Sequence, residues 1–101
     1  MTITIKQGDS DTLTETITGL STLLGYTAKL YIETPAGVEI DTITGTISSL
    51  IITYQIVNED SKAYTLGRNK YETKIFDTSD HVYTTSSGYF IVNEALENDP
   101  T

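Results

Sequence analysis

Alternation of apolar and polar residues with a period of two is the feature that most constrains how this chain can fold. The clearest runs lie at 2–6, 11–18, 26–34 and 71–76. Successive side chains of a β-strand point to opposite faces of a sheet, so each run predicts a strand with one buried face. The composition agrees, because 44 of the 101 residues are Thr, Ile, Val, Tyr or Phe, the types that sheets favour. Period two therefore predicts an all-β protein.

Turn residues separate the runs and indicate how two of them pair. Pro35 and Gly37 lie between two alternating segments, where Pro fixes φ and Gly tolerates a positive φ. We therefore expect a hairpin that pairs 28–34 with 37–43. Further turns are expected at 58–61, 77–80 and 86–88.

Three segments depart from simple alternation. The pattern slips by one residue at 48–49, which predicts a turn or a bulge, because such a slip would otherwise move every following side chain to the opposite face. Residues 50–57 are apolar on both faces and are expected to form a central strand that is covered on both sides. Residues 61–66 fit either one short helical turn or an extended crossover.

These segments amount to seven to nine short strands with almost no helix. Such strands bury their apolar faces economically in an immunoglobulin-like antiparallel β-sandwich. We expect a single domain over 1–93, followed by an acidic tail at 94–101. Tyr71 follows a glycine-containing turn, where immunoglobulin-like sandwiches place a tyrosine whose hydroxyl bonds to upstream backbone. Tyr71 is therefore either such a corner or a half-buried strand aromatic.

The charge and the missing residue types exclude several classes of function. The net charge is −8, whereas nucleic-acid binders gain affinity by neutralising phosphates. The chain has no Cys, which excludes a disulfide framework, a thiolate nucleophile and a sulfur-based zinc site. No apolar run approaches the roughly 20 residues of a membrane helix. We expect neither nucleic acid nor membrane as a partner, and synthesis in the cytoplasm.

No cluster of residues in the sequence predicts catalysis or a bound cofactor. His81 is the only imidazole, and beside Asp77 and Asp80 it is typical of a solvated turn rather than of a general base. Asp9 and Asp11 could supply oxygens to Ca²⁺, but the EF-hand spacing is absent and turns select the same residues. We therefore expect a protein without enzymatic activity, cofactor or metal site.

Charged and edge residues suggest contacts with other proteins instead. Glu15 shares a face with Leu13 and Ile17, so it either protects an edge strand or pairs with a Lys across an interface. Four of the six cations lie between positions 62 and 74, which suggests a basic patch that meets an acidic patch on another copy. The alternative is an ordinary solvated surface. The candidate interface residues are Ile3, Ile5, Glu15, Lys62, Arg68, Lys70 and Lys74.

Four stretches of the chain resemble one known family. Residues 3–13 (ITIKQGDSDTL) resemble its opening pattern I-x-I-x-Q-G-D-(S/T), and residues 24–32 (LGYTAKLYI) resemble its pattern L-x-G-Y/A-T-x-x-x-x-I/V. Residues 67–75 (GRNKYETKI) and 83–92 (YTTSSGYFIV) are similar to its later strands. The family is the N-terminal domain of the upper baseplate protein of siphophages that infect lactic-acid bacteria.

The resemblance implies an immunoglobulin-like β-sandwich that assembles, without catalysis, into a phage particle as a tail, baseplate or neck component. Its partners would be other virion proteins and further copies of the chain in a homo-oligomer, and its location the virion. A carbohydrate-binding or host-surface adhesion module is the alternative. It requires surface aromatic residues in one plane, for which Tyr31, Tyr54 and Tyr83 are the candidates.

Overall fold

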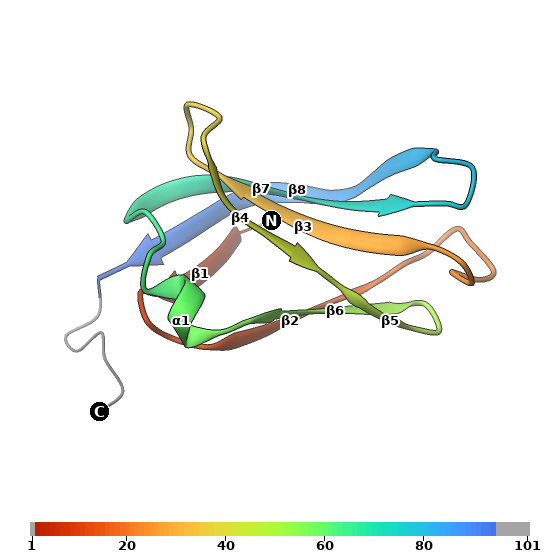
Figure 1. Cartoon of the computed structure of the whole chain (residues 1–101), viewed down its shortest axis with the longest axis horizontal. Helices are drawn as coiled ribbons and strands as arrows, with labels where there is room; N and C mark the ends of the chain where they lie inside the picture. The colour runs from red at the N-terminus through yellow and green to blue at the C-terminus, as the bar shows by residue number, and fades with distance from the viewer. Residues whose placement is uncertain (1, 95–101) are drawn as a thin grey trace.

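The computed structural model describes residues 2–94, which form two layers of β-strands (Figure 1). Of the predicted acidic tail at 94–101, all but Glu94 lies outside the described residues. The elements are, in chain order, β1 (Thr2–Lys6), β2 (Asp11–Thr16), β3 (Thr27–Glu33), β4 (Glu39–Thr44), β5 (Thr46–Ser48), β6 (Ile51–Ile56), α1 (Asn58–Ser61), β7 (Gly67–Phe76) and β8 (Val82–Asn93).

The strands form one sheet of five and one sheet of three. The larger sheet has the order β1-β8-β7-β3-β4, and the smaller has the order β2-β6-β5. All neighbours are antiparallel except β1 and β8, which pair in parallel. Two facing sheets in this order form an immunoglobulin-like sandwich, in which β2 and β7 correspond to strands B and F. The predicted all-β sandwich is confirmed, with eight strands among residues 2–94.

The core fills the space between the two sheets, and period-two alternation supplies it. Each central strand turns every second side chain inward, where apolar burial stabilises the fold. The inward residues of these strands are Ala28, Leu30 and Ile32 of β3, Ile52, Tyr54 and Ile56 of β6, Tyr71 and Ile75 of β7, and Phe90 and Val92 of β8.

Local turn chemistry explains two of the hairpins: the first is predicted as a hairpin, and the second as a turn or a bulge. β3 pairs with β4, with Leu30 opposite Ile43, and the connecting turn holds Gly37 at a φ of 90°. The slip at 48–49 is the tight turn between β5 and β6, where Ser49 has a φ of 57°. Both hairpins follow from residues that are adjacent in the sequence.

The prediction for 50–57 is correct in one respect and wrong in another. β6 is the central strand of the three-stranded sheet, as expected. It is not covered on both faces, however, because Ile51 is 47 % exposed and Gln55 is exposed as well. One side of a two-layer sandwich faces solvent, so an outward Ile keeps much of its surface in water.

The turn predicted at 86–88 is wrong, because β8 runs without interruption from Val82 to Asn93. The register against β7 shifts instead: Thr73 lies opposite Ser86, and Lys74 lies opposite Thr84. Thr85 is therefore an extra residue in a β-bulge. Ser and Gly residues are common in turns, but here long-range pairing with β7 holds them in a strand.

The segment between β6 and β7 contains the short helix and then crosses between the sheets. The sequence leaves 61–66 open between a helical turn and an extended crossover. The helical turn is α1, which ends at Ser61, and the rest of the segment crosses to the larger sheet. The Ser61 hydroxyl donates to the Asp9 carbonyl at 2.6 Å, and the Asn69 amide donates to the Thr65 carbonyl at 2.9 Å. The buried polar side chains Ser61 and Asn69 are thus satisfied.

Of the two interpretations of Tyr71, the structure fits the strand aromatic and not the corner. Tyr71 lies in the middle of β7 and is buried, and its hydroxyl contacts the Ser86 hydroxyl at 3.4 Å on the neighbouring strand. The side chain that bonds to upstream backbone is Asn69, two residues earlier. The strand begins at Gly67 rather than after it, which places Tyr71 too far along the strand for a corner.

Candidate functional site: a polar cavity between β2 and β8

A cavity of about 420 Å³ opens between the two sheets, on the side where β2 and β8 face each other. Its wall from the smaller sheet is β2 from Thr12 to Thr16, together with Tyr54 of β6. Its wall from the larger sheet includes Tyr71 and Thr73 of β7, Thr85 and Ser86 of β8, Ile3 of β1 and Leu30 of β3. We call this space the β2–β8 cavity. Its volume lies in the range of small-ligand sites.

The bulge in β8 explains why polar groups line an interior surface. In a regular strand, Thr85 and Ser86 would point to opposite faces. The register shift lets both adjacent residues contribute to the cavity wall. Bulges re-aim side chains in this way beside functional sites.

Hydroxyl groups connect the two sheets across the cavity. The Thr85 hydroxyl donates to Oε1 of Glu15 at 3.1 Å and lies 2.9 Å from the Thr73 hydroxyl. Because a hydroxyl carries one proton, Thr73 is the donor to Thr85 when Thr85 donates to Glu15. Antibody domains join strands B and F with a disulfide. In this chain a carboxylate–hydroxyl chain links β2 to β8 and β7.

Glu15 is therefore an inward charge on an edge strand, as the first of its two predicted interpretations states. Its side chain is half-buried. Among residues 2–94, the ion pairs are Lys70 with Glu33 and His81 with Asp77, and neither involves Glu15. The carboxylate thus faces the cavity without a cation from the described part of the chain.

Tyr54, a residue of the same wall, has a buried hydroxyl without a partner among residues 2–94. The residue is 2 % exposed, and its hydroxyl is the one buried side-chain polar atom without a hydrogen-bond partner in the described part of the chain. Burial, and second the negative charge of Glu15, raise the pKa of Tyr54 well above its ordinary value. The phenol is therefore neutral at physiological pH, and it keeps both a donor and an acceptor unused.

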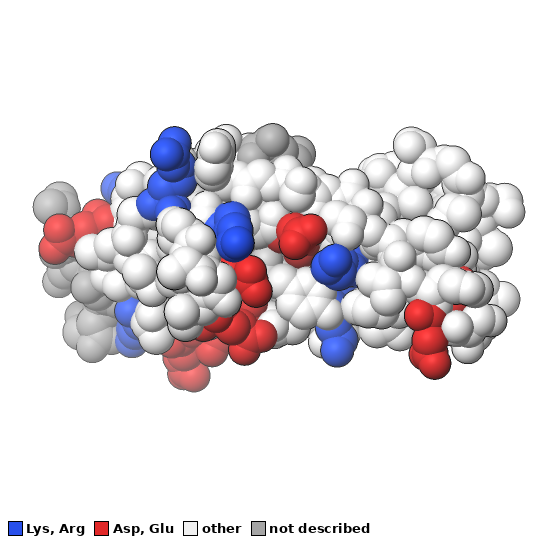
Figure 2. Space-filling view, turned by 90° about the horizontal axis from the view of Figure 1, so that it is seen from above, with Lys and Arg blue, Asp and Glu red and all other residues white. Residues whose placement is uncertain are grey.

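The predicted basic patch divides into two parts. Arg68, Lys70 and Lys74 alternate along β7 and share the outer face of the larger sheet, whereas Lys62 follows α1. Figure 2 shows cations interspersed with acidic side chains on the face that it displays. Each outer cation has a neighbour: Lys70 lies 3.8 Å from Glu33, Arg68 stacks over Tyr89, and Lys74 donates to Thr84.

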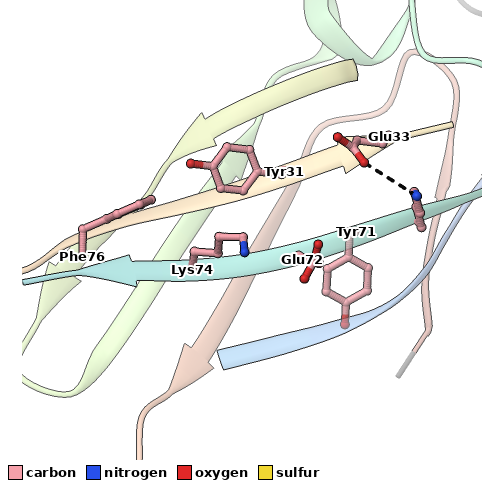
Figure 3. A pocket seen from close by; sticks show the side chains of 7 residues that line it. Tyr31, Glu33, Tyr71, Glu72, Lys74 and Phe76 are labelled. Carbon is pink, nitrogen blue, oxygen red and sulfur yellow. Dashed lines mark ion pairs between the residues drawn. The ribbon is translucent and has the colours of Figure 1, made fainter. Parts of the chain in front are cut away.

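A shallow hollow of about 200 Å³ lies on that outer face (Figure 3). Tyr31, Glu33, Glu72, Lys74 and Phe76 surround it. Its charges alternate in sign, so they offset one another, and exposed pairs of this kind contribute little. This face has the character of the solvated surface that was the alternative to a basic patch.

The candidate contacts at Ile3 and Ile5 need correction. Both side chains point between the sheets: Ile5 is 5 % exposed and belongs to the core, and Ile3 lines the β2–β8 cavity. Neither side chain is available as a surface anchor. The outward residues of β1 are Thr2, Thr4 and Lys6.

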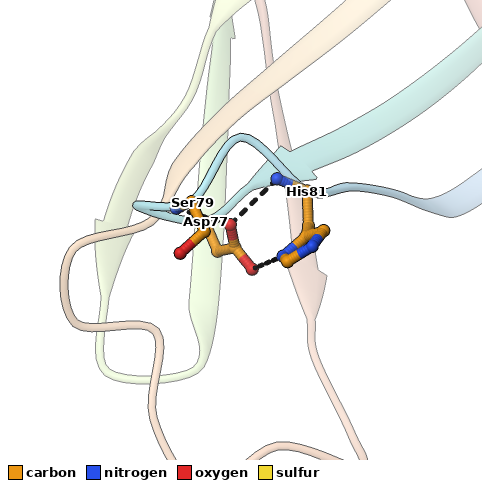
Figure 4. Close-up of polar contacts among 3 residues, drawn as sticks. All are labelled: Asp77, Ser79 and His81. Carbon is orange, nitrogen blue, oxygen red and sulfur yellow. Dashed lines mark hydrogen bonds and ion pairs between the residues drawn. The ribbon is translucent and has the colours of Figure 1, made fainter.

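His81 sits in the turn between β7 and β8 (Figure 4). Its Nδ1 lies 3.0 Å from Oδ2 of Asp77, and the backbone N–H groups of His81 and Ser79 donate to Oδ1. Desolvation opposes ionisation of Asp77, but these donors and the imidazole outweigh it, so the pKa of Asp77 lies below its ordinary value. The His81 side chain is 68 % exposed, which fits a solvated turn.

The acidic turn at Asp9 and Asp11 has local partners. Asp11 Oδ1 accepts from the Thr12 backbone N–H at 2.8 Å, and Asp9 is exposed. Within residues 2–94, no three His, Cys, Asp or Glu side chains gather in a way that could hold a metal ion. The same residues include no helix that is long and apolar enough to cross a membrane.

The three tyrosines proposed for carbohydrate stacking do not share a plane. Tyr54 is buried between the sheets, Tyr31 borders the hollow on the outer face, and Tyr83 is 47 % exposed on β8. Sugar rings stack on flat, accessible aromatic surfaces, so this arrangement does not form the predicted platform.

Comparison with known proteins supports the fold. No protein-family model matches the chain, and no curated protein matches it. Solved structures do match, and one is CopC from Methylosinus trichosporium OB3b, with a TM-score of 0.57 and 9 % sequence identity over 94 % of this chain and 86 % of that chain. At this identity the likeness concerns the β-sandwich alone.

The predicted function as a phage virion structural protein is wrong by this comparison. CopC, one of the solved structures that match, is a copper-binding periplasmic protein and not a phage component. The resemblance of residues 3–13, 24–32, 67–75 and 83–92 to the baseplate family stays a prediction. We retain neither the virion function nor its carbohydrate-binding alternative.

Sequence reasoning found part of the cavity and missed the rest. It singled out Glu15, because a charge on an apolar face breaks the alternation. It did not connect Glu15 with Thr73, Thr85 or Tyr54, which lie on other strands. The run of four hydroxyl residues at 84–87 was the available signal, because it has no alternation to fix its direction.

Proposed function

We propose that the chain is a non-enzymatic binding domain that receives its ligand in the β2–β8 cavity. The observation that supports this most is Tyr54, which belongs to the cavity wall with Glu15 and whose buried hydroxyl has no partner in the described part of the chain. A buried polar group without a partner costs about 1–3 kcal/mol. A bound ligand that supplies the partner offsets this cost.

The chemistry of the wall selects a ligand group with N–H or O–H donors. The free lone pairs belong to the Glu15 carboxylate and to the Tyr54 phenol oxygen, while Thr73 and Thr85 already bond to each other. A half-buried carboxylate without a cation favours a positive charge beside it. An organic ammonium group satisfies both conditions, and Leu13, Leu30 and Ile3 offer apolar surface to its carbon atoms.

Copper binding, the property of the CopC neighbour, finds no comparable support. The chain contains one His and no Cys, and copper sites draw mainly on imidazole and sulfur ligands. His81 pairs with Asp77 in an exposed turn. The proposal therefore rests on the cavity and not on the fold likeness.

An NMR titration with n-butylammonium, and with n-butanol as the uncharged probe, tests the proposal. We expect n-butylammonium to shift the amide signals of β2 and of Thr85 and Ser86, and n-butanol to shift them less. Tyr54→Phe should weaken n-butylammonium binding several-fold, because it removes one acceptor. Tyr31→Phe is the matched control, since Tyr31 lies on the outer face, and it should bind as the wild type does.

Two results would contradict the proposal. One is the absence of cavity shifts with both probes at concentrations that leave the protein folded. The other is equal binding by Tyr54→Phe and the wild type, which would assign the shifts to a different surface.

A further inference from the structure

The outer edge of β8 is open beside the β2–β8 cavity. β1 pairs only with residues 89–93, and β7 occupies the other side of β8 along its length. Val82–Ser87 therefore has no strand on its outer side among the described residues. Figure 1 shows β1 starting near the middle of the molecule and leading away from the β7–β8 turn. We call Val82–Ser87 the β8 edge.

A second hollow continues the cavity along this edge. It measures about 290 Å³ and is lined mainly by apolar groups, including Ile17, Leu20, Tyr26 and Tyr83. Thr85 lines both this hollow and the β2–β8 cavity, so the two spaces adjoin. Along β8, the apolar hollow comes first, at Tyr83, and the acidic cavity follows, at Thr85 and Ser86. An open backbone edge thus runs beside one apolar and one acidic site.

We propose that the β8 edge and these two spaces bind an extended basic peptide segment of another protein, which adds as a strand beside β8. The proposal rests on the function proposed above and names its ligand: the ammonium group belongs to a Lys or Arg side chain. Backbone hydrogen bonds to an open edge provide affinity, and pockets for alternate side chains provide specificity.

The spacing of a strand fits the two spaces. Side chains at i and i+2 lie on the same face, about 6.6–6.8 Å apart. If the side chain at position i of the peptide is apolar and fills the hollow at Tyr83, a Lys or Arg at position i+2 would therefore enter the cavity with Glu15. The stretch Val82–Ser87 has six residues, which is long enough for such a segment.

Charge favours a basic partner over a second copy of this chain. The chain has a net charge of −8, so two copies repel each other. An antiparallel pairing of two β8 edges would also present only Val, Tyr, Thr and Ser residues to each Glu15. A basic peptide supplies the missing cation and is drawn towards the acidic protein.

The experiment uses the full chain and four synthetic heptapeptides with blocked ends. The first has the sequence Ser-Thr-Val-Thr-Lys-Thr-Ser. The second has the reverse sequence, so that a strand running in the opposite direction along β8 can also place its Val in the hollow and its Lys in the cavity. The other two carry norleucine in place of Lys. Amide hydrogen exchange and NMR shifts of residues 82–87 report strand addition, and titration gives the affinities.

We expect one of the two Lys peptides to bind and to protect amides of the β8 edge from exchange. Norleucine should weaken that peptide about tenfold or more, because a charge-assisted bond to Glu15 is lost. Glu15→Gln should produce a similar loss for the Lys peptide and little change for the norleucine peptide. Glu33→Gln, on the outer face, is the control variant and should leave both affinities unchanged.

Each other outcome overturns the inference. If n-butylammonium binds in the cavity and neither Lys peptide does, the inference fails and the binding function stands. If the peptides bind but Lys and norleucine, or Glu15 and its Gln variant, behave alike, the basic recognition fails. If the edge becomes protected without peptide as the protein concentration rises, the occupant is a second copy.

Discussion

Two buried tyrosines occupy opposite situations in this sandwich. The Tyr64 hydroxyl donates to Oδ2 of Asp41 at 2.5 Å, and its ring meets Phe90 edge to face at a centroid distance of 6.0 Å. The Tyr54 hydroxyl has no partner in the described part of the chain, and the residue belongs to the wall of the β2–β8 cavity. Both residues are 2 % exposed. Equal burial thus hides a difference in hydrogen bonding.

The difference separates a region that stabilises the fold from one that is available to a ligand. Around Tyr64 the neighbouring buried polar groups, Ser61 and Asn69, also have backbone partners. A satisfied polar network fixes one arrangement, whereas an unsatisfied group weakens the structure that contains it. Removing the two hydroxyl groups should therefore have opposite consequences.

The largest expected effect comes from the matched substitutions Tyr64→Phe and Tyr54→Phe. Tyr64→Phe should lower the free energy of unfolding by about 2 kcal/mol, because it removes a hydrogen bond to a carboxylate. Tyr54→Phe should leave that free energy unchanged or raise it by up to about 1 kcal/mol, because a buried unpaired hydroxyl disappears. Urea unfolding at pH 7 measures both. Equal losses in the two variants would remove the distinction between the regions.

Alkaline unfolding offers a second, smaller contrast. Burial, followed by the hydrogen bond to Asp41 and the charges of Asp41 and Asp60, raises the pKa of Tyr64 above its ordinary value, and burial with Glu15 does the same for Tyr54. Groups with a raised folded-state pKa stabilise the protein fully below the unfolded value and lose that effect as the pH rises. Stability should therefore fall above about pH 10, by about 1.4 kcal/mol per pH unit for each buried phenol.

Urea unfolding between pH 8 and pH 11 checks this expectation. Above pH 10, the slope of the unfolding free energy against pH measures the number of protons released on unfolding. Each Tyr→Phe variant should lower that number by about one, and the double variant should lower it by about two. A slope that is identical in the wild type and in Tyr54→Phe would show that the Tyr54 phenol ionises as readily in the folded chain as in the unfolded one.

The smallest expected effect lies in the exposed turn at His81, which serves as a reference outside both regions. The lowered pKa of Asp77 means that its contribution is present at neutral pH and is lost as the pH falls through the folded-state value. His81→Ala should raise the pKa of Asp77 towards its ordinary value in an NMR titration, and it should lower the urea midpoint of unfolding at pH 7 only slightly, because the pair is exposed. An unchanged pKa would mean that the backbone donors alone lower it.

Much of the fold could be predicted because it depends on neighbours in the sequence. Pro35 and Gly37 mark a hairpin, and the slip at 48–49 marks another, since turn geometry and period two act over a few residues. The candidate site was predictable only at Glu15, where a charge interrupts an apolar face. The prediction that Ile3 and Ile5 contact another protein was wrong, because both side chains lie on the face of β1 that the second sheet covers. Alternation separates the two faces of a strand but does not say what packs on each face.

The sequence by itself determined that this chain forms short half-buried strands, since alternating side chains can bury an apolar face only in a sheet. The tertiary structure alone decided that β1 pairs in parallel with β8, that Thr85 bulges inward, and that nothing within residues 2–94 reaches the Tyr54 hydroxyl. These features depend on contacts between strands up to about 90 positions apart, where long-range pairing and packing override local preference.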